Sequence, residues 1–217
     1  MKYIVTGRVH PERANVNIDL PPMHPIGGGQ ILVRCEASQL TVVLTDQPIE
    51  GYISAFMLAE HIAQAAVSAL GFSLATGYVV ELVQVIEESG VVHIFGVRAP
   101  DLVFEPHEAV FAASVQLVGS DLAFRMAVAD YGNALRDSYR CASLCFRAIE
   151  AIKSGFGPGS DNEQWSRMHA ALGTLREPID TTVKKFADAI RHGDWANTVL
   201  TDSAQRLAML KVTRDVR

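Results

Sequence analysis

The stretch Lys184-Lys185-Phe186-Ala187-Asp188-Ala189-Ile190-Arg191-His192-Gly193 has apolar residues at helical spacing and closes with basic residues, one histidine and a glycine. This pattern predicts the last turns of a helix that ends at Gly193. A second stretch, residues 139–153, has the same helical spacing and carries Arg140, Arg147 and Glu150. Titratable groups gather on these two predicted helices, which makes them the candidate functional centre of the chain.

The helical spacing seen in these stretches extends over the whole second half of the chain. From residue 106 onward strand signals nearly vanish, and the last helix stops without a capping signal before Arg217, as is typical of a fragment or of a tail that a partner completes. Gly132 and Asn133 are expected to break one helix, and Ser120 is expected to cap another. The predicted helices cover residues 108–118, 121–131, 134–154, 165–175, 178–191 and 199–216.

The first half shows the alternation of β-strands instead. Apolar residues over 50–70 follow helical spacing, which predicts one helix that ends at Gly71 and packs on the sheet. The three glycines at 27–29 lack a following Lys-Ser/Thr and a helix, so we interpret them as a connecting loop and not as a phosphate cradle. The predicted strands cover residues 2–9, 15–19, 30–36, 40–45, 78–87 and 91–97.

These patterns predict an α+β chain of two domains. Residues 1–105 form an antiparallel sheet packed with one helix, and residues 106–217 form a bundle of four to five helices. Pro100 and Pro106 bracket the predicted connection between the two. A length of 217 residues and a hydrophobic content of 49% are sufficient for two small cores.

Composition narrows the location and the partners. The chain has no run of about 18 apolar residues and no apolar leader at its start, so we expect neither a membrane span nor a signal peptide. Three cysteines are typical of reduced thiols in the cytoplasm. Residues 1–117 carry 5 basic and 12 acidic groups, a net charge of −7, whereas residues 118–217 carry 14 basic and 12 acidic groups, a net charge of +2. Ten of those basic groups are arginines, which suit phosphate.

The two basic helices suggest a site in which a proton donor faces phosphate ligands. Arg147 and Glu150 share a helix face, and Arg140 lies two turns before Arg147 on much the same face. Arg191 and His192 end the facing helix. A histidine moves protons near neutral pH and an arginine grips a phosphate, which is what metal-free phosphodiester cleavage requires. The alternative is structural: Glu150 pairs with an arginine to bridge helices, and His192 favours a helix C-terminus.

The order of these segments resembles the HEPN superfamily over residues 120–217. The resemblance rests on Arg147-Ala148-Ile149-Glu150-Ala151-Ile152 in a long helix, on a helix hairpin, and on Ile190-Arg191-His192-Gly193. It implies a four-to-five-helix bundle, often dimeric. Many members are metal-independent ribonucleases of toxin, anti-phage and CRISPR systems, and others bind nucleotides, RNA or protein. The family pattern is an arginine, four to six residues, then histidine; His192 matches, but the allowed positions hold Lys185, Phe186 and Ala187.

Other residue types give no further site. Cys141 and Cys145 are four apart, a spacing that can bind metal, but no additional ligand stands at a supporting spacing, so we interpret them and Cys35 as core residues. We expect no metal and no cofactor. Nucleophile elbows, dinucleotide fingerprints and paired catalytic carboxylates do not occur.

Two functions follow from these patterns. The first is a HEPN-like, non-catalytic binding or oligomerisation module in a nucleic-acid or defence context. As the resemblance implies, we expect such a module to form a homodimer and to bind RNA or a nucleotide, here through Arg140, Arg147 and Glu150. We expect a protein partner to bind the N-terminal domain. The alternative is a metal-independent ribonuclease that uses His192 as general acid or base, with Lys185 or Arg191 on the phosphate.

Overall fold

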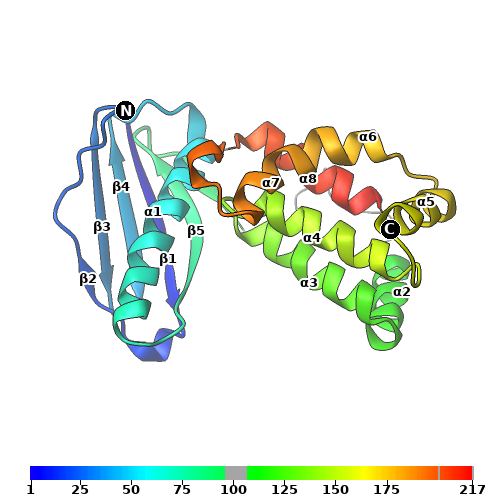
Figure 1. Cartoon of the computed structure of the whole chain (residues 1–217). Helices are drawn as coiled ribbons and strands as arrows, with labels where there is room; N and C mark the ends of the chain where they lie inside the picture. The colour runs from blue at the N-terminus through cyan, green and yellow to red at the C-terminus, as the bar shows by residue number, and fades with distance from the viewer. Residues whose placement is uncertain (96–106, 200, 217) are drawn as a thin grey trace. The chain divides into compact units, whose positions relative to one another are not determined.

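Alternating apolar residues build an antiparallel sheet in the first part of the chain (Figure 1). In this computed structural model, residues 1–95, 107–199 and 201–216 are described. Their strands lie in the order β2-β3-β4-β1-β5-β6, and every neighbouring pair is antiparallel. The strands are β1 Lys2–His10, β2 Ile18–Asp19, β3 Gln30–Glu36, β4 Gln39–Thr45, β5 Val79–Glu87 and β6 Val92–Ile94.

One face of this sheet is buried under helix α1, Gly51–Ser73 (Figure 1). The buried face alternates with an outer face along each strand, as the period of two requires. The helix contributes small residues, so its backbone can lie close to the sheet. The buried side chains that line this core include Tyr3, Val5, Val9, Val33, Val42, Leu44, Ala55, Ala59, Ala63 and Val67.

Glycine is required where two elements approach closely. A Cβ on Gly7 would overlap the Glu81 carbonyl and lie 2.8 Å from Leu82 Cα, next to a bulge in the β1–β5 pairing. Gly71 was expected to end α1, but the helix continues to Ser73. Gly71 instead lies buried where a Cβ would meet the Thr76 carbonyl at 2.5 Å, which explains the residue by packing and not by helix termination.

The predicted strand over residues 15–19 is mostly a connection, since only Ile18–Asp19 is extended in the sheet. Asn15 adopts a left-handed conformation, with φ of 52°, and the Val16 N–H is bonded to the Ser38 side chain at 2.9 Å. The Val16 N–H is therefore bonded to a side chain and not to the backbone of a neighbouring strand. The predicted boundary at residues 105 and 106, with Pro100 and Pro106, lies outside the described residues.

The second part of the chain is helical, so the fold class is α+β as predicted. The chain divides into two compact units, Met1–Val97 and Arg98–Arg217, called here the sheet unit and the helical unit. A π-helical segment, Ile179–Lys184, joins α6 directly to α7, and a short 3₁₀ turn covers Trp195–Asn197. The α-helices of the helical unit are α2 His107–Ser120, α3 Leu122–Arg136, α4 Cys141–Ser154, α5 Asp161–Leu172, α6 Arg176–Pro178, α7 Lys185–Arg191 and α8 Ser203–Asp215.

Helix α4 is central in the helical unit and contacts α3, α5, α7 and α8. Its apolar side, with Phe146 and Ile149, packs against Trp165 and Met168 of α5 and against Met209 of α8. Further members of this buried cluster come from α4 and α8 themselves, from α3, from the segment 179–187 and from Val216.

Helix ends differ from the predictions where side chains bond to the backbone. The helix expected over 134–154 begins at Cys141, because α3 runs through Gly132 and Asn133 to Arg136. The break lies at Asp137, whose side chain accepts the Arg140 N–H at 2.8 Å.

Three further helix ends differ from the predictions, two because of side-chain caps and one because of a glycine. Asp121, and not Ser120, caps α3, since its side chain accepts the Phe124 N–H at 2.9 Å. Helix α8 begins at Ser203, not at residue 199, behind a capping box of Asp202 and Gln205. Helix α5 ends before Leu175, which is exposed, because Gly173 adopts φ of 64°.

Candidate functional site

The two stretches singled out from the sequence do meet at one ion pair. Arg191, at the end of α7, contacts Glu150 of α4, with Nη2 to Oε2 at 3.0 Å. The Arg191 guanidinium also lies 4.6 Å from the centre of the Phe146 ring and 3.5 Å from an Asp188 oxygen. Three neighbours therefore hold this guanidinium against its own unit, and its charge is already compensated.

Arg147 does not pair with Glu150 although the two share a helix. Its Nη2 lies 3.1 Å from Oδ1 of Asp130 on α3. Asp130 is only 6% exposed, whereas half of the Arg147 side chain is exposed. Arg147 thus neutralises a buried carboxylate between α3 and α4, which is a structural role.

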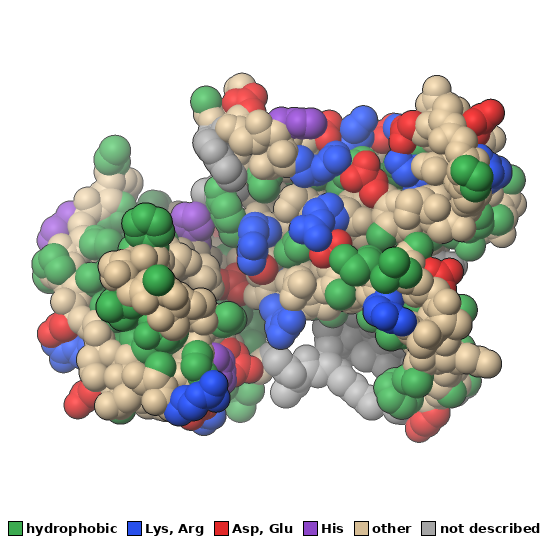
Figure 2. All heavy atoms as spheres, turned by 60° about the horizontal axis from the view of Figure 1, so that its bottom comes forward, with side chains coloured by type: hydrophobic (Ala, Val, Ile, Leu, Met, Phe, Trp, Pro, Cys, Tyr) green, Lys and Arg blue, Asp and Glu red, His purple; other side chains and the backbone are tan. Residues whose placement is uncertain are grey.

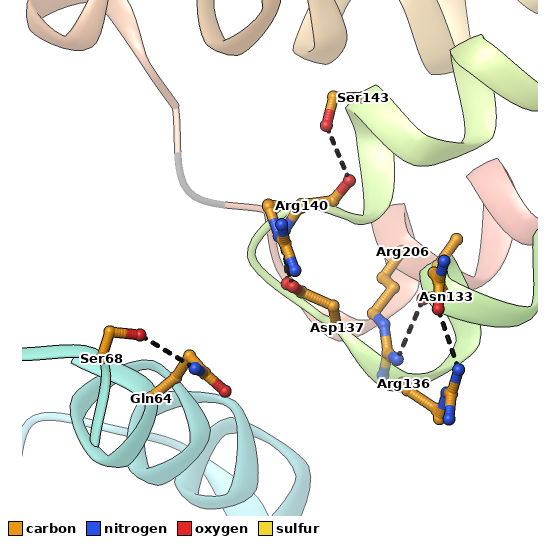
Figure 3. A network of polar contacts seen from close by, with 9 residues as sticks. Gln64, Ser68, Asn133, Arg136, Asp137, Arg140, Ser143 and Arg206 are labelled. Atoms are coloured by element: carbon orange, nitrogen blue, oxygen red, sulfur yellow. Dashed lines mark hydrogen bonds and ion pairs between the residues drawn. The ribbon is translucent and has the colours of Figure 1, made fainter. Parts of the chain in front are cut away.

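Arg140 lies outside α4, in the turn before it. Its Nε contacts the Asp137 carboxylate at 2.5 Å, and its carbonyl accepts the Ser143 hydroxyl at 3.0 Å (Figure 3). The expectation that Arg140 shares a helical face with Arg147 is therefore wrong, because α4 starts only at Cys141. Arg140 organises the N-terminus of this helix.

The side chains of His192 and Lys185 are exposed, and among the described residues neither has a hydrogen bond to an arginine. His192 follows the last residue of α7, and its N–H is bonded to the Asp188 carbonyl at 3.0 Å. For its ring, no hydrogen bond or ion pair is found within the described part of the chain. Lys185 lies at the other end of α7, 5.4 Å from the Phe186 ring centre. Seven residues of helix separate the two groups by about 10 Å along the axis.

The predicted residues therefore form separate contacts and not one open site. Glu150 and Arg191 come together, Arg147 and Arg140 each have their own acidic partner, and His192 stands apart. In the view of Figure 2, basic and acidic side chains are interspersed over the helical unit, so this face carries no stretch of single-sign charge. This arrangement suits a stable scaffold better than a phosphate clamp.

A second charged cluster, which the sequence analysis missed, surrounds Trp165. Lys153 is buried, pairs with Asp161 and lies 5.2 Å from the Trp165 ring centre, while Arg176 lies 4.2 Å from the same centre. The Lys153 bond lowers the pKa of the Asp161 carboxyl. The close sequence spacing of Lys153, Asp161 and Trp165 was the available signal, but a helix pattern does not show which aromatic faces a cation.

His169 belongs to the same cluster. Its ring stacks on Trp165 with centroids 5.4 Å apart, and its Nδ1 lies 2.9 Å from the Thr174 hydroxyl. Burial, together with the charge of Arg176, lowers the pKa of His169. The two cations of this cluster are already paired, Lys153 with Asp161 and Arg176 with Asp180. Neither cation is therefore free to bind a ligand.

One concave surface on the helical unit is shallow. An open depression of about 320 Å³ is lined by Pro158, Glu163, Ser166 and Arg167. The Arg167 guanidinium already donates to the Phe156 and Pro158 carbonyls at 3.0 and 2.6 Å. The depression contains none of the residues singled out from the sequence.

Exposed apolar side chains mark a different kind of surface on helices α2 and α3. Residues 109–120 contain no charged side chain. Phe111 is 69% exposed and Leu122 is 68% exposed, values far above those of core residues. We call this set the α2–α3 surface: Phe111, Val115, Leu117, Leu122 and Met126.

The outer face of the sheet also carries apolar residues. Strand register places Leu32, Val43, Ile4, Ile86 and Val92 side by side across β3, β4, β1, β5 and β6. Directly paired residues point to the same face, and this face is opposite to α1. We call this set the outer row.

Metal-ligating side chains and apolar helices bear on whether the chain binds a metal or spans a membrane. Within residues 1–95, 107–199 and 201–216, no group of three His, Cys, Asp or Glu side chains could hold a metal ion. No membrane span is expected from the sequence, but α1 is long and apolar enough for one by length and composition. Ala55, Ala59, Ala63 and Val67 of this helix belong to the core of the sheet unit.

The fold and its surfaces define an α+β protein with a sheet unit, a helical unit and two apolar surfaces. The chain belongs to the family described as Domain of unknown function DUF8168: its N-terminal domain matches residues 3–95 and its C-terminal domain matches residues 109–217. No curated protein and no solved structure matches the chain significantly.

Proposed function

We propose that this chain is a non-catalytic interaction protein of the cytoplasm that forms a homodimer through its helical unit. The observation that carries the proposal is the α2–α3 surface. Residues 109–120 of α2 carry no charged side chain, and apolar side chains of this helix are exposed to water. Large exposed apolar patches are typical of interaction sites. Three free cysteines, with no disulfide, support the cytoplasmic location.

A second copy of the chain is the partner that we propose for the α2–α3 surface. In a two-fold symmetric dimer the same patch meets itself, so a patch without charge brings no like charges together. Burial of Phe111 and Leu122 in such an interface contributes about 1.5–3 kcal/mol each. Members of the HEPN superfamily are often dimeric, so the resemblance to that superfamily agrees with this proposal. The resemblance itself stays a prediction.

The sheet unit supplies the second half of the proposed function. Its outer row is an apolar strip that runs across five strands, and residues 1–117 carry the acidic excess of the chain. We assign this face to a protein partner, because sheets commonly pack face to face through such rows. RNA or a nucleotide is the ligand that we propose for the arginine-rich helical unit.

Light scattering coupled to size-exclusion chromatography tests the dimer. The full chain is expected to elute as a dimer at micromolar concentration, and Phe111→Asp is expected to weaken association at least about tenfold, since it places a charge in the apolar interface. Phe72→Asp is the matched control, because Phe72 is 91% exposed but lies on the sheet unit. A monomeric wild-type chain, or equal effects of both variants, contradicts the proposal.

A metal-independent ribonuclease is the second function that we propose. Exposed His192 is the observation in its favour. This function comes second for two reasons. The guanidinium of Arg191 is already paired with Glu150 and Asp188, and no arginine stands five to seven residues before His192, where the HEPN pattern requires one. The test is incubation of varied RNAs with the chain in the presence of a metal chelator. Cleavage that His192→Ala abolishes and His24→Ala leaves intact supports it; intact RNA rejects it.

A further inference from the structure

Two cysteines lie next to each other at the N-terminus of the central helix of the helical unit. Cys141 is the first residue of α4 and Cys145 lies one turn later. Both side chains are fully buried, and their sulfur atoms are 3.9 Å apart. This distance allows one thiol to donate a weak hydrogen bond to the other.

A cation lies beside this pair. Arg206 of α8 is anchored by Nη2, which donates to the Leu135 carbonyl at 2.7 Å, and its Nε is buried without a hydrogen-bond partner among the described residues (Figure 3). The bond from Cys145 lowers the pKa of the Cys141 thiol, and the charge of Arg206 lowers it further. The N-terminus of α4 acts in the same direction, because its free N–H groups favour an anion.

The third cysteine provides an internal comparison. Cys35 is buried in the sheet unit, where its thiol donates to the Val16 carbonyl at 3.4 Å. Burial raises the pKa of Cys35. A thiol that donates to a carbonyl is held in its protonated form, whereas the Cys141 sulfur lies 3.9 Å from a second thiol and has the charge of Arg206 nearby. The two sites therefore differ in thiolate character although both are buried.

We propose that Cys141 and Cys145 form an oxidation site that hydrogen peroxide converts to an intramolecular disulfide. The Cys141 thiolate attacks one peroxide oxygen, so that an S–O bond forms, the O–O bond breaks and hydroxide leaves. The Cys145 thiol then attacks the Cys141 sulfur; the S–S bond forms, the S–O bond breaks, and the hydroxyl group leaves with a proton as water. The two thiols lose two electrons in total, and one peroxide becomes two waters.

The disulfide changes the helix. Side chains four apart on an α-helix have Cβ atoms about 5–6 Å apart, whereas a disulfide needs about 3.5–4.5 Å. The first turn of α4 must therefore open to accommodate the bond. This turn is held by the exposed pair of Arg140 and Asp137, and its opening also gives peroxide access to the buried sulfurs.

Peptide mapping of the full chain tests the site directly. Trypsin cuts after Arg140 and Arg147, so one peptide, residues 141–147, contains both cysteines, and Cys35 lies in a different peptide. After native treatment with hydrogen peroxide and alkylation of the remaining thiols, this peptide is expected to be two hydrogen atoms lighter and unalkylated. Its oxidation is expected to proceed at least about tenfold faster than that of Cys35.

Two variants separate the steps. Cys145→Ser removes the second thiol, so a sulfenic acid is expected to accumulate on Cys141 and react with dimedone. Arg206→Gln is expected to slow the oxidation of Cys141 several-fold, and Arg136→Gln is the control, because Arg136 is exposed and bonds Asn133 at 2.8 Å. Circular dichroism of each variant establishes that it is folded.

The proposal is overturned by any of three results on the wild-type chain or a folded variant. The first is a peptide 141–147 that stays fully alkylatable while Cys35 oxidises. The second is oxidation of Cys141 at the same rate in the wild type and in Arg206→Gln. The third is a disulfide that links either cysteine to Cys35 or to a second chain instead of to its neighbour.

Discussion

In the sheet unit the described ion pairs have at least part of each side chain exposed, whereas the helical unit buries two charged side chains among its helices. Among the described residues 1–95 no charged side chain is buried, and pairs such as Arg8 with Glu12 are half exposed. In the helical unit, Asp130 and Lys153 are buried and each has one partner of opposite charge.

This difference separates two ways of specifying a structure. The sheet unit depends on register and on close backbone packing, which salt and pH affect weakly. The helical unit depends in part on paired charges, whose contribution depends on protonation and on both partners being present. The comparison predicts that steric changes act most strongly on the sheet unit and charge changes on the helical unit.

The largest effect is expected from Gly7→Ala. The new Cβ would overlap the Glu81 carbonyl and lie 2.8 Å from Leu82 Cα, so β1 and β5 must separate. We expect a loss of about 3 kcal/mol or more in the free energy of unfolding of the sheet unit, measured by urea titration with circular dichroism.

Two observations check this prediction. Gly77→Ala is the matched control, since a Cβ there meets nothing within 4 Å. Both tryptophans, Trp165 and Trp195, belong to the helical unit, so tryptophan fluorescence is expected to report an unchanged transition. A shifted fluorescence transition means that the two units do not unfold separately, which breaks the comparison.

A smaller effect is expected from Arg147→Ala. The substitution leaves the Asp130 carboxylate buried without its cation, which we expect to destabilise the helical unit by about 2 kcal/mol. Arg140→Ala is the control and is expected to cost about 1 kcal/mol or less, because its side chain is exposed. A double substitution with Asp130→Ala measures the coupling; a coupling near zero contradicts the assignment of Arg147 as the partner of Asp130.

The pair of Lys153 and Asp161 predicts a pH dependence. Because the Lys153 bond lowers the pKa of Asp161 below its ordinary value of 3.8, the pair stabilises the folded state above that pH. The stabilisation decreases as the pH falls through the lowered pKa. Asp161→Asn is therefore expected to lower the thermal midpoint at neutral pH and to match the wild type in strong acid. An equal deficit at both pH values contradicts this linkage.

The fold class could be predicted from the sequence because periodicity differs between the units. Alternation of apolar residues predicted β1, β3, β4 and β5 to within one residue at each end, and helical spacing predicted α1 and the helices of the helical unit. The ends of elements could not be predicted, because they depend on single bonds: Asp137 ends α3, Asp121 caps it, and Gly71 serves packing and not termination.

Contacts between helices were the harder part of the candidate site. The sequence placed Glu150 and Arg191 on helices that could face each other, and the structure has them 3.0 Å apart. The sequence could not show that Arg147 pairs with Asp130 of α3 and not with Glu150, which is three residues away on the same helix. The acidic residue with which an arginine pairs depends on how the helices pack. Here the packing of α3 on α4 depends in turn on where α3 ends.

The smallest effect is expected from Arg8→Ala in the sheet unit, and it sharpens the comparison most directly. Arg8 and Glu12 are 3.0 Å apart, as close as Arg147 and Asp130, so distance alone would predict equal contributions. Both Arg8 and Glu12 are half exposed, and water screens their attraction, so we expect at most about 0.5 kcal/mol. Raising the salt concentration to about 1 M shortens the screening length to about 3 Å and should remove this contribution, while the effect of Arg147→Ala persists because Asp130 stays buried. A cost for Arg8→Ala equal to that for Arg147→Ala at high salt would show that burial of one partner does not distinguish the two units.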